Sequence, residues 1–152
     1  MDGEISTLLG NDIENIVRKL HETGMAVTES LCRALEALQN HRKDIAKEIL
    51  VHDDIVDSQC IDIETSCFHL IATHQPVAGD LRRILSCIQI ASELERIGDH
   101  IKTLANAVST SEQPLTDHLQ NKLQMMGKEI MFRHSVASES LRFLKVASRC
   151  PS

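Results

Sequence analysis

Residues 44–73 read DIAKEILVHDDIVDSQCIDIETSCFHLIAT, and the spacing of their apolar side chains decides the fold class. Aliphatic residues recur at every seventh position, with an isoleucine and two cysteines beside them: Ile49, Val56, Ile63 and Leu70, accompanied by Ile45, Cys60 and Cys67. A seven-residue apolar repeat is typical of a helix that packs along a seam with other helices. Asp44 in the first turn favours a helix start, because the N-terminal end of the helix dipole is positive. This stretch therefore predicts one long helix of a bundle.

Three further helical patterns surround this helix. An upstream pattern covers about residues 12–39. His74-Gln75-Pro76 ends the helix of residues 44–73, because proline disfavours a helical conformation in the residue before it and can begin the next helix. Apolar spacing then predicts a helix over about 77–109 and a fourth over 114–147. We therefore expect an all-α fold, an antiparallel helix bundle.

The composition agrees with one helical domain and excludes several classes of protein. The 152 residues include no Trp or Tyr and only three Phe, so the core must be mainly aliphatic. A formal net charge of −6 argues against a nucleic-acid partner, since phosphate contacts need a basic surface and single strands need aromatic stacking platforms.

The five cysteines and the absence of long apolar runs indicate where in the cell the protein is located. The cysteines are odd in number, most lie at apolar helical positions and none forms a CxxC pair, which favours reduced core thiols in a cytoplasmic protein. No apolar run approaches the roughly 20 residues that cross a bilayer, and the opening residues do not resemble a signal peptide. We expect a cytoplasmic protein with no direct membrane insertion.

The helix predicted at 77–109 carries a pair of carboxylates that could bind a metal ion. Glu95 and Asp99 are four residues apart, so they lie one turn apart on one face and can present oxygens to one hard cation. They lie away from the stripe of Leu94, Ile97 and Ile101. They instead continue an apolar line formed by Val77, Leu81, Ile84 and Ile88. A solvated acidic face explains an isolated pair of this kind more simply.

Two carboxylates would leave a cation mostly bound to water, so a second helix would have to contribute ligands. Asp54 and Asp57 on the neighbouring helix are the better candidates, because Asp53 falls on the apolar face. For these residues too, solvent exposure and ion pairing are the simpler interpretation. Glu93 points away from Glu95 and is expected to pair with Arg96 three residues later.

No pattern of catalytic residues appears. The eight histidines form no HExxH cluster, and the sequence has no GxSxG elbow and no glycine-rich phosphate loop. A metalloenzyme of the carboxylate-bundle kind remains an alternative, although no Glu is followed by a His three residues later, as that class requires. A plain helical oligomerisation module is the other alternative.

Several ordered motifs nevertheless resemble the PhoU family of phosphate-signalling proteins. Gly24-Met25, in reverse order to the usual pair, begins the match. The strongest motifs follow in register: Gln75-Pro76, Asp80-Leu81-Arg82 and Glu95-Arg96-Ile97-Gly98-Asp99. The resemblance divides the chain into an N-terminal tail (1–11), a three-helix repeat (12–110), a helix that starts a second, incomplete repeat (114–147) and a C-terminal tail (148–152).

The resemblance implies a regulator rather than an enzyme. It implies negative control of phosphate uptake and of phosphate-starvation signalling, through contacts with the ATP-binding subunit of the phosphate transporter and with a membrane sensor histidine kinase. It also implies a homodimer, and divalent or trivalent metal ions held by helix carboxylates, with iron or zinc preferred and Mg or Mn as alternatives. Carried over by position, Glu95 and Asp99 are the leading ligands, followed by Asp54 and Asp57.

Overall fold

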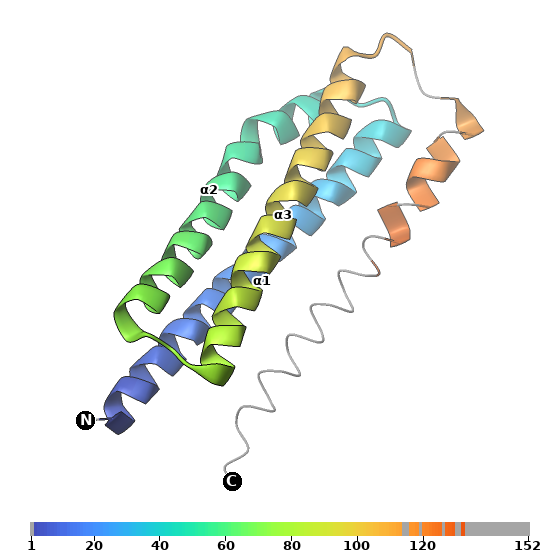
Figure 1. Ribbon diagram of the computed structural model, residues 1–152. Helices are drawn as coiled ribbons and strands as arrows, with labels where there is room; N and C mark the ends of the chain where they lie inside the picture. Colours follow the sequence, from blue (N-terminus) through green and yellow to red (C-terminus); the bar gives the residue numbers. More distant parts are fainter. Residues whose placement is uncertain (1, 114–115, 119, 126, 130–131, 133–152) are drawn as a thin grey trace.

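The computed structural model describes residues 2–113, 116–118, 120–125, 127–129 and 132 (Figure 1). For residues 2–7, 52 and 53 it describes the backbone alone. Three long helices run alternately up and down and pack against one another: α1 (Asp2–Gln39), α2 (Lys43–His74) and α3 (Ala78–Thr110). The prediction of an all-α antiparallel bundle is confirmed. None of the helices in the described part of the chain has an apolar stretch that is long enough, with few enough charged residues, to cross a membrane.

The helix ends lie close to the predicted boundaries, with one exception. α2 and α3 begin and end within one residue of the ranges expected from the sequence. α1, however, begins at Asp2, so the backbone of residues 2–11 is helical where a tail was expected. Leu9 in this segment is buried in the core, which explains why the helix continues toward the N-terminus.

Left-handed residues close the first two helices. His41 and Gln75 have φ values of 50° and 46°, a conformation that commonly ends helices. The backbone N–H of Gln75 donates to the carbonyl oxygen of Ile71 at 3.1 Å. Pro76, directly after it, is buried. The Gln75-Pro76 motif therefore stops α2 and starts the connection to α3, as the sequence predicted.

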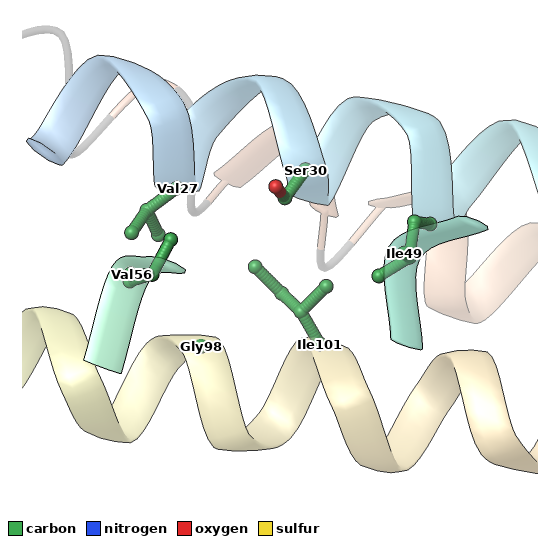
Figure 2. A pocket seen from close by; sticks show the side chains of 6 residues that line it. All are labelled: Val27, Ser30, Ile49, Val56, Gly98 and Ile101. Carbon is green, nitrogen blue, oxygen red and sulfur yellow. The ribbon is translucent and has the colours of Figure 1, made fainter. Parts of the chain in front are cut away.

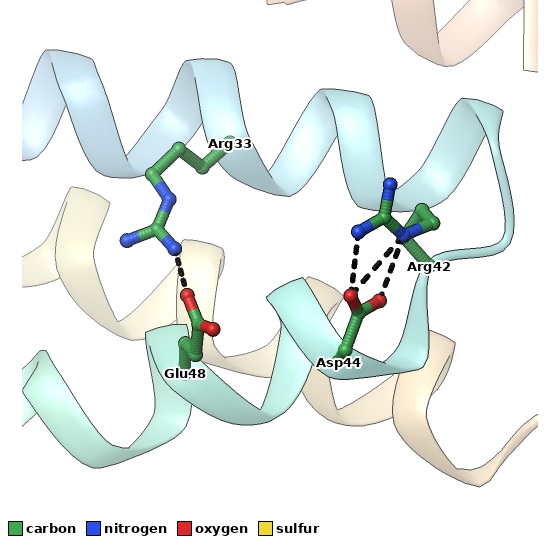
Figure 3. Close-up of polar contacts among 4 residues, drawn as sticks. All are labelled: Arg33, Arg42, Asp44 and Glu48. Atoms are coloured by element: carbon green, nitrogen blue, oxygen red, sulfur yellow. Dashed lines mark hydrogen bonds and ion pairs between the residues drawn. The ribbon is translucent and has the colours of Figure 1, made fainter.

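Two charged pairs lie near the connected ends of α1 and α2 (Figure 3), and one of them joins the two helices. Arg33 on α1 pairs with Glu48 on α2. Arg42, just before α2, donates from Nη2 to Oδ2 of Asp44 at 2.6 Å and from Nε to Oδ1 at 2.9 Å. The hydrogen bond from Arg42 holds the pKa of Asp44 at about 2, below its ordinary value. Asp44 is thus ionised in the first turn of α2, where the helix dipole favours a negative charge.

The core is a set of three seams with alternating three- and four-residue spacing. On α2 the predicted seam is confirmed, because Ile49, Val56, Cys60, Ile63, Cys67 and Leu70 are all buried. The seam of α3 consists of Ile84, Cys87, Ala91, Leu94, Gly98, Ile101, Ala105 and Val108. Every seventh residue from Ala91 to Ala105 is therefore Ala or Gly. Small side chains at these positions let the neighbouring helix backbones approach closely.

The structure corrects the apolar line predicted along α3. Ile84 lies on the buried seam, Leu81 and Ile88 are half-buried beside it, and Val77 lies before the helix and is 78% exposed. The expected line is therefore wrong for Val77, whereas Leu81, Ile84 and Ile88 do lie on the packed side of α3. Only Leu81 and Ile88 share a line with Glu95, because the three are spaced by seven residues, the period of the seams.

A fourth segment contacts α1. Helical residues recur at 117–118, 120–125, 127–129 and 132, and Leu123 packs against the core. Gly127 is buried, and a Cβ added there would collide with the side chain of Leu35. The predicted helix over 114–147 agrees with these residues, and its remainder lies outside the described part of the chain.

Three of the cysteines are core thiols, as predicted. Cys60, Cys67 and Cys87 are buried, whereas Cys32 is exposed, contrary to the general expectation of buried cysteines. Cys150 lies outside the described residues. Burial raises the pKa of Cys67 to about 12 and also raises the pKa of Cys87.

We predict that iodoacetamide at pH 8 modifies Cys32 rapidly in a Cys150→Ser variant and leaves Cys60, Cys67 and Cys87 unmodified until urea is added. The attacking species is the thiolate, and a thiol with a pKa near 11 is only roughly one part in a thousand ionised at this pH. Peptide mass spectrometry after timed quenching measures the rates. Labelling of Cys67 in the native protein as fast as that of Cys32 would contradict the buried seam.

We also predict that Ala91→Leu lowers the free energy of unfolding by about 1–3 kcal/mol, because a larger side chain must fit where two helices approach closely. Ala107→Leu is the matched control, since Ala107 is exposed on the same helix. Its effect should stay within about 0.5 kcal/mol. Urea unfolding followed by circular dichroism gives both values, and equal effects would argue against close packing at Ala91.

Candidate metal site between α2 and α3

The two leading carboxylates lie on the edge of α3 that adjoins α2. Glu95 and Asp99 are both exposed. Glu95 nevertheless lies close enough to the buried thiol of Cys60 on α2 to affect its pKa. Burial raises the pKa of Cys60 to about 11, and the negative charges of Glu95, Asp57 and Glu64 contribute to this rise. Asp57 and Glu95, predicted as ligands from two helices, therefore both lie near one thiol at the α2–α3 contact.

The helical repeat explains why these side chains meet. Leu50, Asp57, Glu64 and Ile71 are spaced by seven residues along α2, and all four are half-buried. Leu81, Ile88, Glu95 and Lys102 have the same spacing along α3. Seven-residue spacing keeps a set of side chains on one flank of a packed helix. These two flanks border the groove between α2 and α3.

The outer carboxylates extend the same surface. Asp54 precedes Asp57 by about one turn, and Asp99 follows Glu95 by about one turn; both Asp54 and Asp99 are exposed. Because α2 and α3 are antiparallel, these two steps run in the same direction along the bundle. All four predicted ligands therefore gather on one part of the α2–α3 surface.

This arrangement supplies carboxylate oxygens that could bind a cation, but these oxygens do not form a complete coordination shell. Among the side chains that the structure describes, no three His, Cys, Asp or Glu groups converge as a metal-ligand set. Oδ1 of Asp57 is shielded from solvent, whereas the other predicted ligands can reorient in solvent. The donor set is rich in oxygen and suits hard or borderline cations, provided that the exposed carboxylates turn toward Asp57.

The remaining motif residues have structural roles. Arg96 donates from Nη1 to Oε1 of Glu93 at 3.1 Å, which confirms the predicted ion pair and leaves it on the exposed side of α3. Asp80 lies in the first turn of α3 and pairs with Arg83 at 3.7 Å. Nε of Arg82 reaches the carbonyl oxygen of Ala78 at 3.5 Å. These contacts organise the start of α3.

Sequence reasoning missed two features of this region. Cys60 and Glu64 belong to the same charged neighbourhood as Asp57 and Glu95. Asp57 and Glu64 are seven residues apart with Cys60 between them, and this spacing could have predicted that the three lie on the same side of α2.

The second missed feature is a small hollow inside the bundle (Figure 2). It is lined by Val27, Ser30, Ile49, Val56, Gly98 and Ile101. It arises where the seams of α1 and α3 carry Ser30 and Gly98 in place of large side chains. The hollow has room for about one water molecule, which is too little for an organic ligand.

Comparison with known proteins agrees with the architecture and the motifs. The PhoU domain model matches residues 20–108, which include most of α1 and nearly all of α2 and α3. The chain is similar to the phosphate-specific transport system accessory protein PhoU homolog of Aquifex aeolicus (strain VF5), with 36% identity over 107 residues, covering 70% of this chain and 48% of the relative.

Two other relatives give the same result. The PhoU homolog of Borreliella burgdorferi is 38% identical over 110 residues, covering 72% of this chain and 49% of the relative. The accessory protein PhoU of Escherichia coli (strain K12) is 30% identical over 125 residues, covering 80% of this chain and 52% of the relative. The chain spans about half the length of these curated relatives. On the family match and these identities, the chain belongs to the PhoU domain family.

Proposed function

We propose that this chain is an accessory regulator of a phosphate-specific transport system. The observation that carries the proposal is the PhoU domain match across all three helices, together with relatives named as accessory proteins of such a system. The chain acts by contact rather than by catalysis.

The regulation we propose is negative. When phosphate is plentiful, the chain contacts the ATP-binding subunit of the transporter and a membrane sensor histidine kinase, and it represses uptake and the starvation response. It works in the cytoplasm as a homodimer. Binding to partners that carry the membrane anchors is consistent with the absence of a spanning helix among the described residues.

We further propose that the α2–α3 carboxylates bind a divalent or trivalent cation. Iron or zinc is preferred, and the oxygen donors also suit Mg²⁺ or Mn²⁺. Asp57 and Glu95 supply the inner donors, while Asp54 and Asp99 complete the site from the rim. A bound cation would offset the mutual repulsion of these carboxylates. Metal occupancy therefore changes the charge of the surface that partners meet.

We predict that Glu95→Ala combined with Asp99→Ala weakens Mn²⁺ or Fe²⁺ binding by more than about tenfold, since it removes the ligands of one helix. Isothermal titration calorimetry measures the affinity, and elemental analysis measures the metal retained on purification. Glu93→Ala combined with Asp62→Ala is the control, because it removes two exposed carboxylates away from the groove. Equal affinity in both double variants would remove the metal proposal.

We predict that the chain restores repression of a phosphate-starvation reporter in cells that lack their own PhoU-type protein. Ile13→Asp, which places a charge at a fully buried core position, should fail to restore it. Co-purification from the same cells tests the partners. The regulatory proposal fails if reporter output stays derepressed although the wild-type chain accumulates in folded form and recovers neither the transporter ATPase nor the kinase.

A further inference from the structure

Three exposed apolar side chains lie together beside the candidate metal site. Ile61 and Phe68 on α2 are 62% and 58% exposed, and Leu85 on α3 is 46% exposed. Because the helices run antiparallel from the turn at Gln75, Phe68 and Leu85 lie at similar heights along them. Half-buried Leu81 and Ile88 belong to the same groove.

This apolar part continues directly into the acidic part. Ile61 and Phe68 are one and two seven-residue steps beyond Asp54 on α2, and so they lie on the same strip of the helix surface. On α3, Asp99 is two such steps beyond Leu85. One continuous strip, here named the α2–α3 strip, thus has an end rich in exposed apolar side chains (Ile61, Phe68, Leu85), with half-buried Glu64 among them, and an acidic end (Asp54, Asp57, Glu95, Asp99), with half-buried Lys102 beyond it.

We propose that the α2–α3 strip docks an amphipathic helix of a partner protein, with apolar residues toward one end of that helix and Lys or Arg toward the other. The apolar end of the strip accepts Leu- or Phe-type anchors, and the acidic end pairs with the basic residues. This inference rests on the proposed regulatory function, and it names the chemistry of the partner segment.

The negative charge of the strip favours a helix with basic residues over a second copy of this acidic chain. The chain has a net charge of −6, and pairing two strips side by side in parallel would place carboxylates against carboxylates. Antiparallel pairing would avoid that repulsion but would place the exposed apolar side chains of each copy against the carboxylates of the other, so that neither group would gain a suitable partner. The proposed homodimer therefore uses another surface.

Cation and partner then compete for the same carboxylates. A divalent ion on Asp57 and Glu95 offsets the charge that attracts the basic end of the partner helix. Because coupling between two ligands is reciprocal, the partner helix must weaken cation binding by the same factor. The strip thereby links metal occupancy to partner contact.

The probe is a synthetic, fluorescein-labelled helical peptide of about 20 residues, which is about 30 Å long and therefore more than spans the strip, about 21 Å from Asp54 to Phe68. It carries Leu and Phe on one face of its first half and Lys on the same face of its second half. Fluorescence anisotropy with the full chain in EDTA measures its affinity. A peptide with Glu in place of every Lys is its charge control.

We expect Ile61→Ser with Phe68→Ser to weaken binding of the Lys peptide at least tenfold, and Asp54→Asn with Asp99→Asn to weaken it and to flatten its salt dependence. Val51→Ser with Ile55→Ser is the matched control, because these residues are equally exposed on α2 but lie off the strip. All six substituted positions are exposed, so circular dichroism should show an unchanged helical content. Mn²⁺ should weaken peptide binding to the wild type, and should weaken it less in the Asp54→Asn, Asp99→Asn variant, which keeps only the two inner donors Asp57 and Glu95.

Three results would overturn the proposal. The Glu peptide could bind as tightly as the Lys peptide, or the Val51→Ser, Ile55→Ser control could lose as much affinity as the strip variant. Sedimentation could instead show a wild-type dimer that Ile61→Ser with Phe68→Ser dissociates, which would assign the strip to a second copy. Binding in EDTA is measured without metal or reporter, so failure of the proposed metal site or regulatory function remains distinguishable from failure of the strip.

Discussion

The contact between α2 and α3 determines both the fold and the candidate site. Small residues recur at every seventh position of the α3 seam, at Ala91, Gly98 and Ala105, and they let α3 pack closely on its neighbours. Close packing fixes the relative height of the two helices. That height brings Glu95 beside Cys60 and Asp57, although Asp57 and Glu95 are far apart in sequence.

The same contact accounts for the mixed character of the surface above it. The flanking positions at seven-residue spacing are Leu50, Asp57, Glu64 and Ile71 on α2, and Leu81, Ile88, Glu95 and Lys102 on α3. Because the helices are antiparallel, Ile71 and Leu81 both lie near the turn that joins them, and Asp57 and Glu95 lie at a similar height farther along. The proposed cation site and the proposed docking strip both rest on this one packing arrangement.

The sequence predicted most of the fold because its signals are local or periodic. Ile49 to Leu70 define a seam that needs no tertiary information, and Gln75-Pro76 marks the end of α2 through backbone geometry alone. The start of α1 was missed because the burial of Leu9 depends on the other helices. Glu95 and Asp99 were found from their spacing, whereas their proximity to Asp57 depends on helix register, which spacing within one helix cannot supply. Val77 was wrongly placed on the apolar line because it precedes α3 in an extended conformation and is exposed, which the spacing of apolar residues cannot show.

The central claim is that carboxylates from both helices form one cation site, and paramagnetic broadening by Mn²⁺ tests it most directly. Amide signals of the ¹⁵N-labelled chain should broaden at substoichiometric Mn²⁺ in two separate segments at once, around residues 54–57 of α2 and 95–99 of α3. Acidic positions about 20 Å away along the same helices, such as Asp44 and Asp80, should broaden only at higher concentrations. Broadening spread equally over all exposed carboxylates, or a Mn²⁺ affinity that Asp57→Asn and Glu95→Gln each leave unchanged, would contradict the account.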